Sequence, residues 1–177
     1  MRKCLFLDRD GIVNHDIGYA YKPEEIRFMP GIFSLCRAYQ QAGFAIVIVT
    51  NQSGIARGYY SEEEFQRLNL WFRQRFAEQG IHITDIFHCP HHPAINGHCW
   101  CRKPNPGMLV QAMRKYHFRP DACVMLGDKK SDMQAALRAG ITNRILVDGE
   151  RPVYKRCLAA TQQVPSLLAL LQQGVCK

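Results

Sequence analysis

The sequence predicts an α/β fold, with one doubly wound, Rossmann-like parallel sheet and helices on both of its faces. Short apolar runs that resemble strands alternate along the chain with amphipathic segments of helical period. A strand, a helix and a second strand in that order form a right-handed parallel unit. Several of the apolar runs also end abruptly in polar clusters, and ligands bind at the carboxyl ends of the strands in such open sheets.

Length and composition bound the organisation of the chain. The 177 residues and the hydrophobic content of 47% suit a single domain over residues 1–177, with one core. No large insertion interrupts the predicted strands, so we expect no separate cap domain. The charged start precedes only a short apolar stretch, and no apolar run approaches the ~18 residues of a membrane span. We therefore expect a cytoplasmic protein without membrane contact.

The formal charge of +8 favours an anionic partner, either a phosphorylated metabolite or a nucleic acid. The chain has no long run of lysine and arginine, which disfavours nucleic acid. Its eight cysteines accompany no export signal, so a metal site is a better use for them than disulfides. Nothing in the pattern calls for more than a monomer.

The first predicted strand, Cys4–Leu7, stops at two carboxylates, Asp8 and Asp10, which are followed by Gly11. Two acids so close repel each other unless a cation lies between them or one holds a proton. A hard divalent ion such as Mg2+ meets that need. One aspartate could then attack phosphorus while the other transfers protons. The alternative is a solvated turn, and the tetrapeptide alone does not separate the two.

The second predicted unit is a helix over residues 30–41, which ends before Gly43, and a β-branched strand over residues 45–49. The strand ends in the small polar cluster of residues 50–54. Such a cluster can hold a phosphate with side-chain and backbone donors. The same composition is common in ordinary turns, and the position at a second strand end favours the phosphate site.

A capping box at Ser61–Glu64 begins the next helix, which carries aromatic residues at helical spacing and ends near Gly80. We interpret those aromatic residues as core. A strand over residues 83–87 follows and leads into a segment rich in cysteine and histidine.

That segment, residues 89–101, predicts a structural zinc loop. One histidine and three cysteines form a closed, soft ligand set with no position left for a catalytic water: Cys89, His91, Cys99 and Cys101. His92 or His98 could replace His91, and the alternative to zinc is a reduced or redox-active cysteine cluster. A loop held by zinc would present Arg102 and Lys103 rigidly to phosphate groups, whereas elsewhere they would be solvated charges.

The last part of the chain supplies a third carboxylate. A helix over residues 106–116 and a strand over 122–126 lead to Asp128, which can complete the Mg2+ site. We expect Ser131 to cap the next helix and Asp132 either to cap it or to hold the metal through water. A strand over 144–147 follows, and a terminal helix is expected over about residues 164–173.

In order and spacing, Asp8-x-Asp10-Gly11, Thr50-Asn51, Lys103 and Gly127-Asp128 resemble the four motifs of the haloacid dehalogenase superfamily of phosphatases. The resemblance covers the chain from Arg2 to about Val147. More narrowly, LDRDGIVN, TNQSGIARG, CPHH, CRKP and GDK resemble its histidinol-phosphate phosphatase branch, which includes phosphatases of a heptose bisphosphate. The segment between His91 and Cys99 is shorter than that resemblance leads us to expect.

The resemblance implies an Mg2+-dependent phosphomonoesterase with a structural zinc ion and a sugar bisphosphate as substrate. It implies hydrolysis of the 7-phosphate of D-glycero-D-manno-heptose 1,7-bisphosphate, on the route to lipopolysaccharide. The implied catalytic residues are the nucleophile Asp8, the general acid/base Asp10, and Thr50 and Lys103 on the phosphoryl group. Mg2+ would be held by Asp8, the main-chain oxygen of Asp10, and Asp128. The implied substrate-binding residues are Asp16, Gly18, Tyr19, Asn51, Gln52, Ser53, Arg102 and Lys129.

Two other functions remain open at this point. One is hydrolysis of histidinol phosphate, or of another small phosphate, by the same branch. The other is a zinc-containing module that binds nucleic acid, which would explain the charge and the cysteines but leaves the three carboxylates at the strand ends without a purpose.

Overall fold

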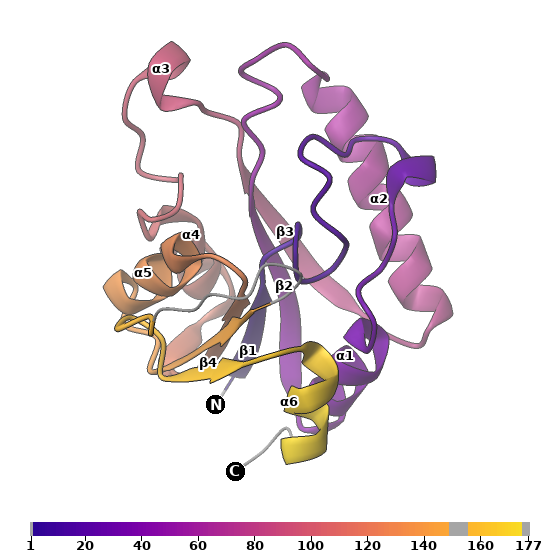
Figure 1. Ribbon diagram of the computed structural model, residues 1–177, viewed down its shortest axis with the longest axis vertical. Helices are drawn as coiled ribbons and strands as arrows, with labels where there is room; N and C mark the ends of the chain where they lie inside the picture. Colours follow the sequence, from indigo (N-terminus) through magenta and orange to yellow (C-terminus); the bar gives the residue numbers. More distant parts are fainter. Residues whose placement is uncertain (1, 149–155, 175–177) are drawn as a thin grey trace.

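The computed structural model describes residues 2–148 and 156–174 and contains a parallel six-stranded sheet in the order β3-β2-β1-β4-β5-β6 (Figure 1). The strands are β1 (Arg2–Leu7), β2 (Phe44–Asn51), β3 (Ile83–Cys89), β4 (Phe118–Gly127), β5 (Asn143–Val147) and β6 (Gln162–Val164). Strand β1 lies in the middle, with β2 on one side and β4 on the other. The predicted parallel α/β sheet is confirmed.

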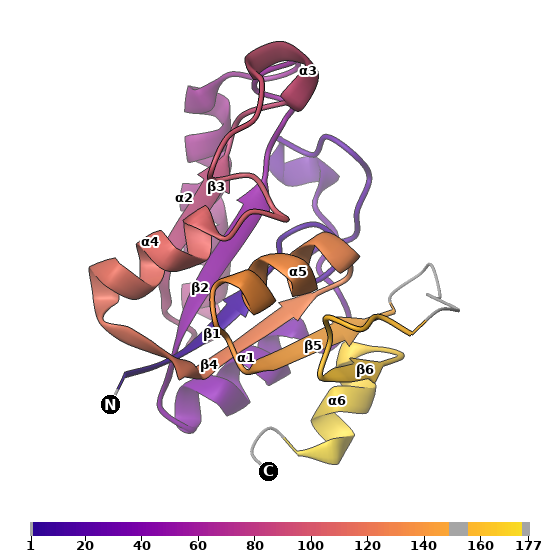
Figure 2. The same cartoon turned by 90° about the vertical axis from the view of Figure 1, so that its left-hand side faces the viewer.

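Helices cover both faces of this sheet (Figure 2). One face carries α1 (Ile32–Gln41), α2 (Glu62–Glu78) and α6 (Leu167–Gln173), and the other carries α4 (Gly107–Tyr116) and α5 (Lys130–Arg138). The predicted doubly wound arrangement is therefore confirmed. None of the helices in the described ranges is long and apolar enough to cross a membrane.

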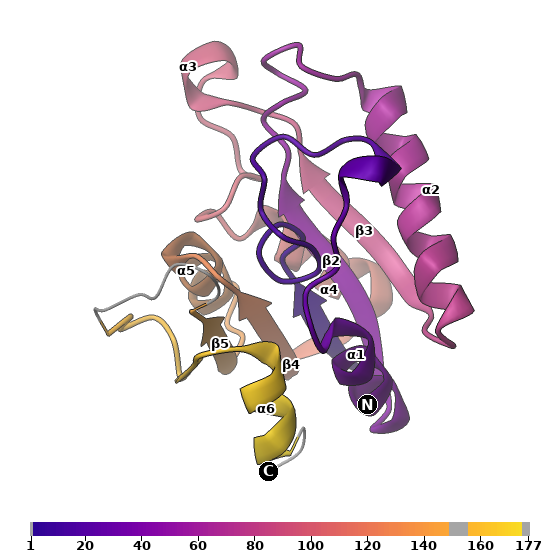
Figure 3. The same ribbon diagram turned by 45° about the vertical axis from the view of Figure 1, so that its right-hand side comes forward.

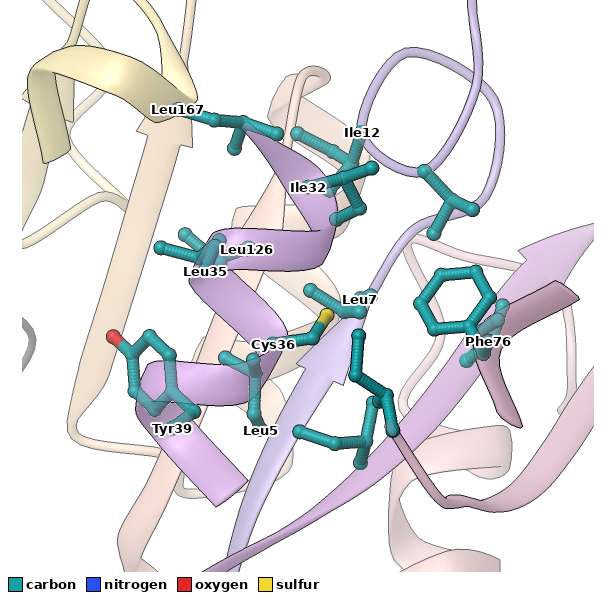
Figure 4. Close-up of a cluster of buried hydrophobic side chains, with 14 of the residues drawn as sticks. Leu5, Leu7, Ile12, Ile32, Leu35, Cys36, Tyr39, Phe76, Leu126 and Leu167 are labelled. Atoms are coloured by element: carbon teal, nitrogen blue, oxygen red, sulfur yellow. The ribbon is translucent and has the colours of Figure 1, made fainter. Parts of the chain in front are cut away.

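The core is split by the sheet, and β1 faces both halves. Leu5 and Leu7 pack against Ile32 and Leu35 of α1 (Figure 4), whereas the alternate residue Phe6 packs on the side of α4 and α5. Because successive side chains of a strand point to opposite faces, a strand covered on both sides must be apolar throughout. This requirement explains why Cys4–Leu7 is a continuous apolar run that ends at Asp8, where the strand leaves the core.

Two loops lie at the carboxyl edge of the sheet. The loop between β1 and α1 coils beside the ends of β1 and β2 and contains the short helix η1 (Pro23–Glu25) near α2 (Figure 3). The loop between β3 and α4 contains the single-turn helix α3 (Pro93–Asn96).

The C-terminal segment differs from the prediction. Residue 164 ends the edge strand β6, and the helix begins only at Leu167, with the Ser166 hydroxyl accepting a hydrogen bond from the Ala169 amide at 3.1 Å. Pro165 separates the two elements because proline has no N–H for a strand ladder or a helix interior. A three-residue strand is too short to produce a periodic signal in the sequence.

The expected N-cap of α5 was also wrong. The helix begins at Lys130, with Lys129 as its N-cap residue, so Ser131 lies inside the first turn. The Asp132 carboxylate instead accepts a hydrogen bond from the Lys129 amide at 3.0 Å. Of the two roles left open for Asp132, capping is the one the structure shows, because its side chain reaches back to the free amide at the helix start.

Candidate active site

Polar side chains from three neighbouring strands meet at the carboxyl edge of the sheet. Asp8 follows β1, Thr50 lies at the end of β2, and Asp128 follows β4. These strands adjoin at the point where the strand order reverses, which is where open α/β sheets form ligand sites. A cavity of about 410 Å³ opens there, lined by Asp8, Asp10, Thr50, Asn51, Arg102, Lys103, Lys129, Ser131 and Asp132. All four predicted catalytic residues therefore line one cavity.

Lys103 links the strand ends through its ammonium group. Its Nζ lies 2.7 Å from an oxygen of Asp8, 2.7 Å from an oxygen of Asp132 and 2.9 Å from the carbonyl oxygen of Val49. Burial alone would lower the pKa of Lys103, but the charges of Asp132 and Asp8 raise it to about 12. Lys103 is therefore a fixed positive charge beside Asp8 at neutral pH.

Asn51 holds Lys103 in place from the end of β2. Its side-chain amide donates to the carbonyl oxygen of Lys103 at 3.1 Å, and its oxygen accepts from the amide of Lys103 at 3.0 Å. Because both functional atoms of the Asn51 side chain bind the backbone of Lys103, this side chain positions the loop that carries the ammonium group.

Asp8, Asp128 and Asp132 form a carboxylate cluster whose ligand oxygens lie within 4.8 Å of one another. Burial raises the pKa of Asp8, and burial together with the charge of Asp8 raises that of Asp128 to about 8. One buried oxygen of Asp128 has no hydrogen-bond partner among the described residues. A buried, unpaired carboxylate oxygen beside a second acid is a fit for a hard divalent cation such as Mg2+.

Gly11 makes room for this cluster. It has a φ of +102°, and a Cβ atom at this position would lie 2.3 Å from an oxygen of Asp128. Any side chain would therefore collide with the acid and also strain the backbone. The glycine that follows the two aspartates in the sequence thus has a steric reason to be there.

The Asp10 carboxylate lies outside the carboxylate cluster. It accepts hydrogen bonds from the Arg9 guanidinium, from the Asn14 amide at 3.1 Å and from the Gln52 amide at 3.1 Å. A metal contact from Asp10 would therefore use its main-chain oxygen, as the family resemblance implied.

A second hollow of about 240 Å³ adjoins the first, and the two share Asp10, Asn51 and Lys129. Its other lining residues are Asp16, Gly18, Tyr19, Gln52, Ser53 and Tyr60. Every predicted substrate-binding residue therefore lines one hollow or both. Lys129 lines both hollows, and its Nζ lies 2.9 Å from an oxygen of Asp16.

Sequence reasoning missed Tyr60 and assigned no site contact to Ser131. Tyr60 directly precedes a capping box and follows another tyrosine, so it has no signal that separates it from a core aromatic residue. The ion pair of Asp132 with Lys103 joins the first turn of α5 to a loop that is distant in the chain, so it has no local sequence signature.

The predicted zinc ligands also come together. The Sγ atoms of Cys89 and Cys101 lie 2.9 Å apart, each is 3.5 Å from Cys99, and Nδ1 of His91 lies 3.3 Å from Cys101. His92 is engaged elsewhere, since its ring nitrogens contact Arg57 and the amide of Ala94. Three thiols and one imidazole nitrogen, all within 4.8 Å of one another, are a suitable ligand set for a tetrahedral metal site.

Comparison with known proteins agrees with this geometry. A family model described as HAD-hydrolase-like matches residues 100–164. A D-glycero-beta-D-manno-heptose-1,7-bisphosphate 7-phosphatase from Yersinia pestis is 43% identical over 97% of this chain and 94% of its own. An enzyme from Photorhabdus laumondii named for the alpha anomer is 43% identical over 85% of each chain.

Among solved structures, the D,D-heptose 1,7-bisphosphate phosphatase of B. bronchiseptica superimposes with a TM-score of 0.85 at 33% identity, over 97% of each chain. That structure is a complex with magnesium and phosphate. Identity at this level over nearly the whole length shows common descent, so this chain belongs to the haloacid dehalogenase-like phosphatases, in the family of the D-glycero-D-manno-heptose-1,7-bisphosphate 7-phosphatases.

Proposed function

We propose that this phosphatase hydrolyses the 7-phosphate of D-glycero-D-manno-heptose 1,7-bisphosphate, a step in the synthesis of ADP-heptose. One observation carries the proposal. The chain is 43% identical to an enzyme of that name, its motif residues Asp8, Asp10, Thr50, Asn51 and Lys103 line one cavity at the strand ends, and Asp128 lies beside Asp8.

In the proposed mechanism, Asp8 attacks phosphorus and an aspartyl phosphate forms. Lys103, at 2.7 Å from Asp8, places a positive charge where the transferring phosphoryl oxygens would gather. Thr50 adds a hydroxyl donor from the end of β2. Asp10 gives a proton to the leaving alkoxide and then takes one from the attacking water.

Mg2+ would be held by Asp8, Asp128 and the main-chain oxygen of Asp10, and would neutralise charge between carboxylate and phosphate. One oxygen of Asp132 lies 2.7 Å from the ammonium of Lys103, and the other accepts a hydrogen bond from the Lys129 amide. We therefore assign Asp132 to holding Lys103.

The basic residues at the mouth of the cavity support a substrate with two phosphates. Arg102 and Lys129 line the cavity, and the guanidinium of Arg57 lies 2.8 Å from the ring of His92. Desolvation, and then the charges of Arg57 and Arg102, lower the pKa of His92. A second phosphate could bind Arg102, which lines the cavity in addition to Lys103.

Histidinol phosphate carries an ammonium and an imidazole, which call for acidic partners. Asp16 is the nearest acid in the second hollow, and the ammonium of Lys129 already pairs with it at 2.9 Å. This ion pair disfavours a cationic substrate at the mouth and agrees with the bisphosphate.

We assign a structural zinc ion to Cys89, His91, Cys99 and Cys101. We also propose that one chain carries out the whole reaction. Arg102 supports the structural role of the zinc loop, because its guanidinium donates to the carbonyl oxygen of His91 at 3.1 Å. We propose that the protein acts as a monomer, because no step of the proposed mechanism calls for a residue of a second chain.

The test is kcat/KM for heptose 1,7-bisphosphate, fructose 1,6-bisphosphate and histidinol phosphate, measured side by side on the wild type and on Arg102→Ala. We expect the heptose bisphosphate to rank first and Arg102→Ala to raise its KM. A higher kcat/KM for histidinol phosphate, or an unchanged KM in Arg102→Ala, would contradict the proposed substrate and support only the assignment to this phosphatase family.

A further inference from the structure

Tyr60 is a buried residue of the site that the proposed mechanism does not use. Tyr60 is 4% exposed and lines the second hollow. Its hydroxyl donates a hydrogen bond to Oε1 of Gln52 at 2.5 Å, and Gln52 is itself 3% exposed. Two buried polar groups are thus paired directly behind the residues proposed for chemistry.

The other end of the Gln52 amide contacts both of those residues. Nε2 of Gln52 donates to an oxygen of Asp10 at 3.1 Å and to the hydroxyl oxygen of Thr50 at 2.7 Å. An amide nitrogen has two hydrogens, so these two bonds use its full donor capacity. Because the Thr50 oxygen accepts from Gln52, its own hydrogen is left for another acceptor, such as a phosphoryl oxygen in the cavity.

The amide could rotate by 180° with little change in shape, and only its partners decide between the two orientations. In the flipped orientation, Oε1 would face the Asp10 carboxylate and neither group could donate. The Tyr60 hydroxyl selects the observed orientation by offering a donor to Oε1. Burial raises the pKa of Tyr60 to about 12, so that donor keeps its proton at neutral pH.

The surroundings fix the Tyr60 ring. It stacks on Tyr21 with ring centroids 5.3 Å apart and an interplanar angle of 12°. It also lies so close to Gly54 that a Cβ there would be 2.2 Å from a ring carbon. The phenol oxygen therefore has a set position relative to Gln52.

We propose that Tyr60 is a positioning residue, which acts through the Gln52 amide to hold the Asp10 carboxylate and the Thr50 hydroxyl in their working orientations. The inference rests on the proposed roles of Asp10 and Thr50. It assigns Tyr60 no contact with substrate, so it predicts an effect on kcat and little effect on KM.

The test is Tyr60→Phe, which removes the hydroxyl and keeps the stacked ring. With p-nitrophenyl phosphate as the probe, we expect kcat to fall by about tenfold, as for the loss of other residues that support a reactive group, with KM within about twofold of wild type. Tyr39→Phe is the matched control, because it removes a buried phenol hydroxyl from α1, far from the site. It should keep the wild-type kcat.

A double-mutant cycle with Gln52→Ala shows whether Tyr60 acts through the amide. In the Gln52→Ala background, Tyr60→Phe should change kcat by less than about twofold. A wild-type kcat in Tyr60→Phe, or an equal loss of kcat in both backgrounds, would overturn the inference. Should Tyr60→Phe fail to fold, Gln52→Glu takes its place. A wild-type kcat in Gln52→Glu would also overturn the inference. Because p-nitrophenyl phosphate is a generic substrate, the result for Tyr60 does not depend on the proposed natural substrate. That proposal is tested separately, by the ranking of kcat/KM among the natural substrates.

Discussion

The carboxylate cluster and the cysteine–histidine cluster are both suited to a metal, yet they are built in opposite ways. Asp8 and Asp132 line the active-site cavity, and an oxygen of Asp128, the third acid of the cluster, is buried without a partner among the described residues. The cysteine–histidine cluster offers four soft ligand atoms that face one another. An incomplete oxygen set leaves coordination positions for water and phosphate, whereas a complete soft set leaves none. The first arrangement suits chemistry and the second suits the support of a loop.

The largest expected effect tests whether the carboxylate cluster is the chemical one. Asp8→Asn should lower kcat by about a thousandfold or more, because an amide cannot form the aspartyl phosphate. Asp10→Asn should also be nearly inactive for want of a proton donor. Activity against p-nitrophenyl phosphate and the far-UV circular dichroism spectrum are the measurements. Wild-type turnover by a folded Asp8→Asn protein would rule out the nucleophile.

The second prediction separates the two clusters by their hold on metal. Mild EDTA treatment should remove activity, and added Mg2+ should restore it, because an open oxygen site exchanges its ion readily. Zinc measured by atomic spectroscopy should stay near one ion per chain through the same treatment, because three thiolates hold it. Parallel loss of both ions would contradict the contrast drawn between the clusters.

The third prediction concerns the closed cluster alone. Cys101→Ser should lower the melting temperature by on the order of 10 °C and raise KM before it lowers kcat, because metal binding is coupled to the order of the loop that carries Arg102. Cys157→Ser is the control, since Cys157 is buried outside the cluster. A zinc-free Cys101→Ser protein with wild-type KM and stability would contradict a structural role for the zinc ion.

The smallest effect concerns the support beneath the cysteine–histidine cluster. Asp85, on the strand that leads to Cys89, accepts hydrogen bonds from Lys115 at 2.8 Å and from Tyr116 at 2.7 Å, both at the end of α4. Partial burial favours the protonated carboxyl and so would raise the pKa of Asp85, but these hydrogen bonds lower it overall. A lowered pKa adds stability above the unfolded-state value of about 4, and that stability is lost as the pH falls through the folded-state value.

Asp85→Asn should therefore cost about 0.5 kcal/mol of unfolding free energy at pH 7, because solvent screens these partly exposed charges. The cost should begin to shrink toward pH 3, as the wild-type carboxyl starts to take up a proton below the unfolded-state pKa. Urea unfolding at the two pH values is the measurement, and Glu63→Gln is the control, since the Glu63 carboxylate is exposed and lies 3.8 Å from the guanidinium of Arg67. An Asp85→Asn cost that does not change with pH would show that the carboxylate charge contributes nothing.

The sequence by itself determined the fold class, the family, the three cysteines of one cluster and two of the three acids, Asp8 and Asp128, of the other. Strand β1 is apolar throughout because both of its faces are covered, so its end at Asp8 could be located from composition alone. The cysteines and histidine are close in sequence, so a loop of ordinary length brings them together. For Asp8, Thr50 and Asp128, the rule that parallel strands end at one edge was sufficient.

Only the tertiary structure decided how those residues are held. The ion pair of Lys103 with Asp132, the Asn51 contacts to the Lys103 backbone and the Tyr60–Gln52 pair each join segments that are distant in the chain or that carry no periodic signal. The sequence also did not predict the short strand β6 or the start of α5. Pairing with β5 determines β6, and the hydrogen bond from the Lys129 amide to Asp132 determines where α5 begins. Local propensity specifies elements, whereas the direction of a buried hydrogen bond depends on which donors and acceptors the fold brings within reach.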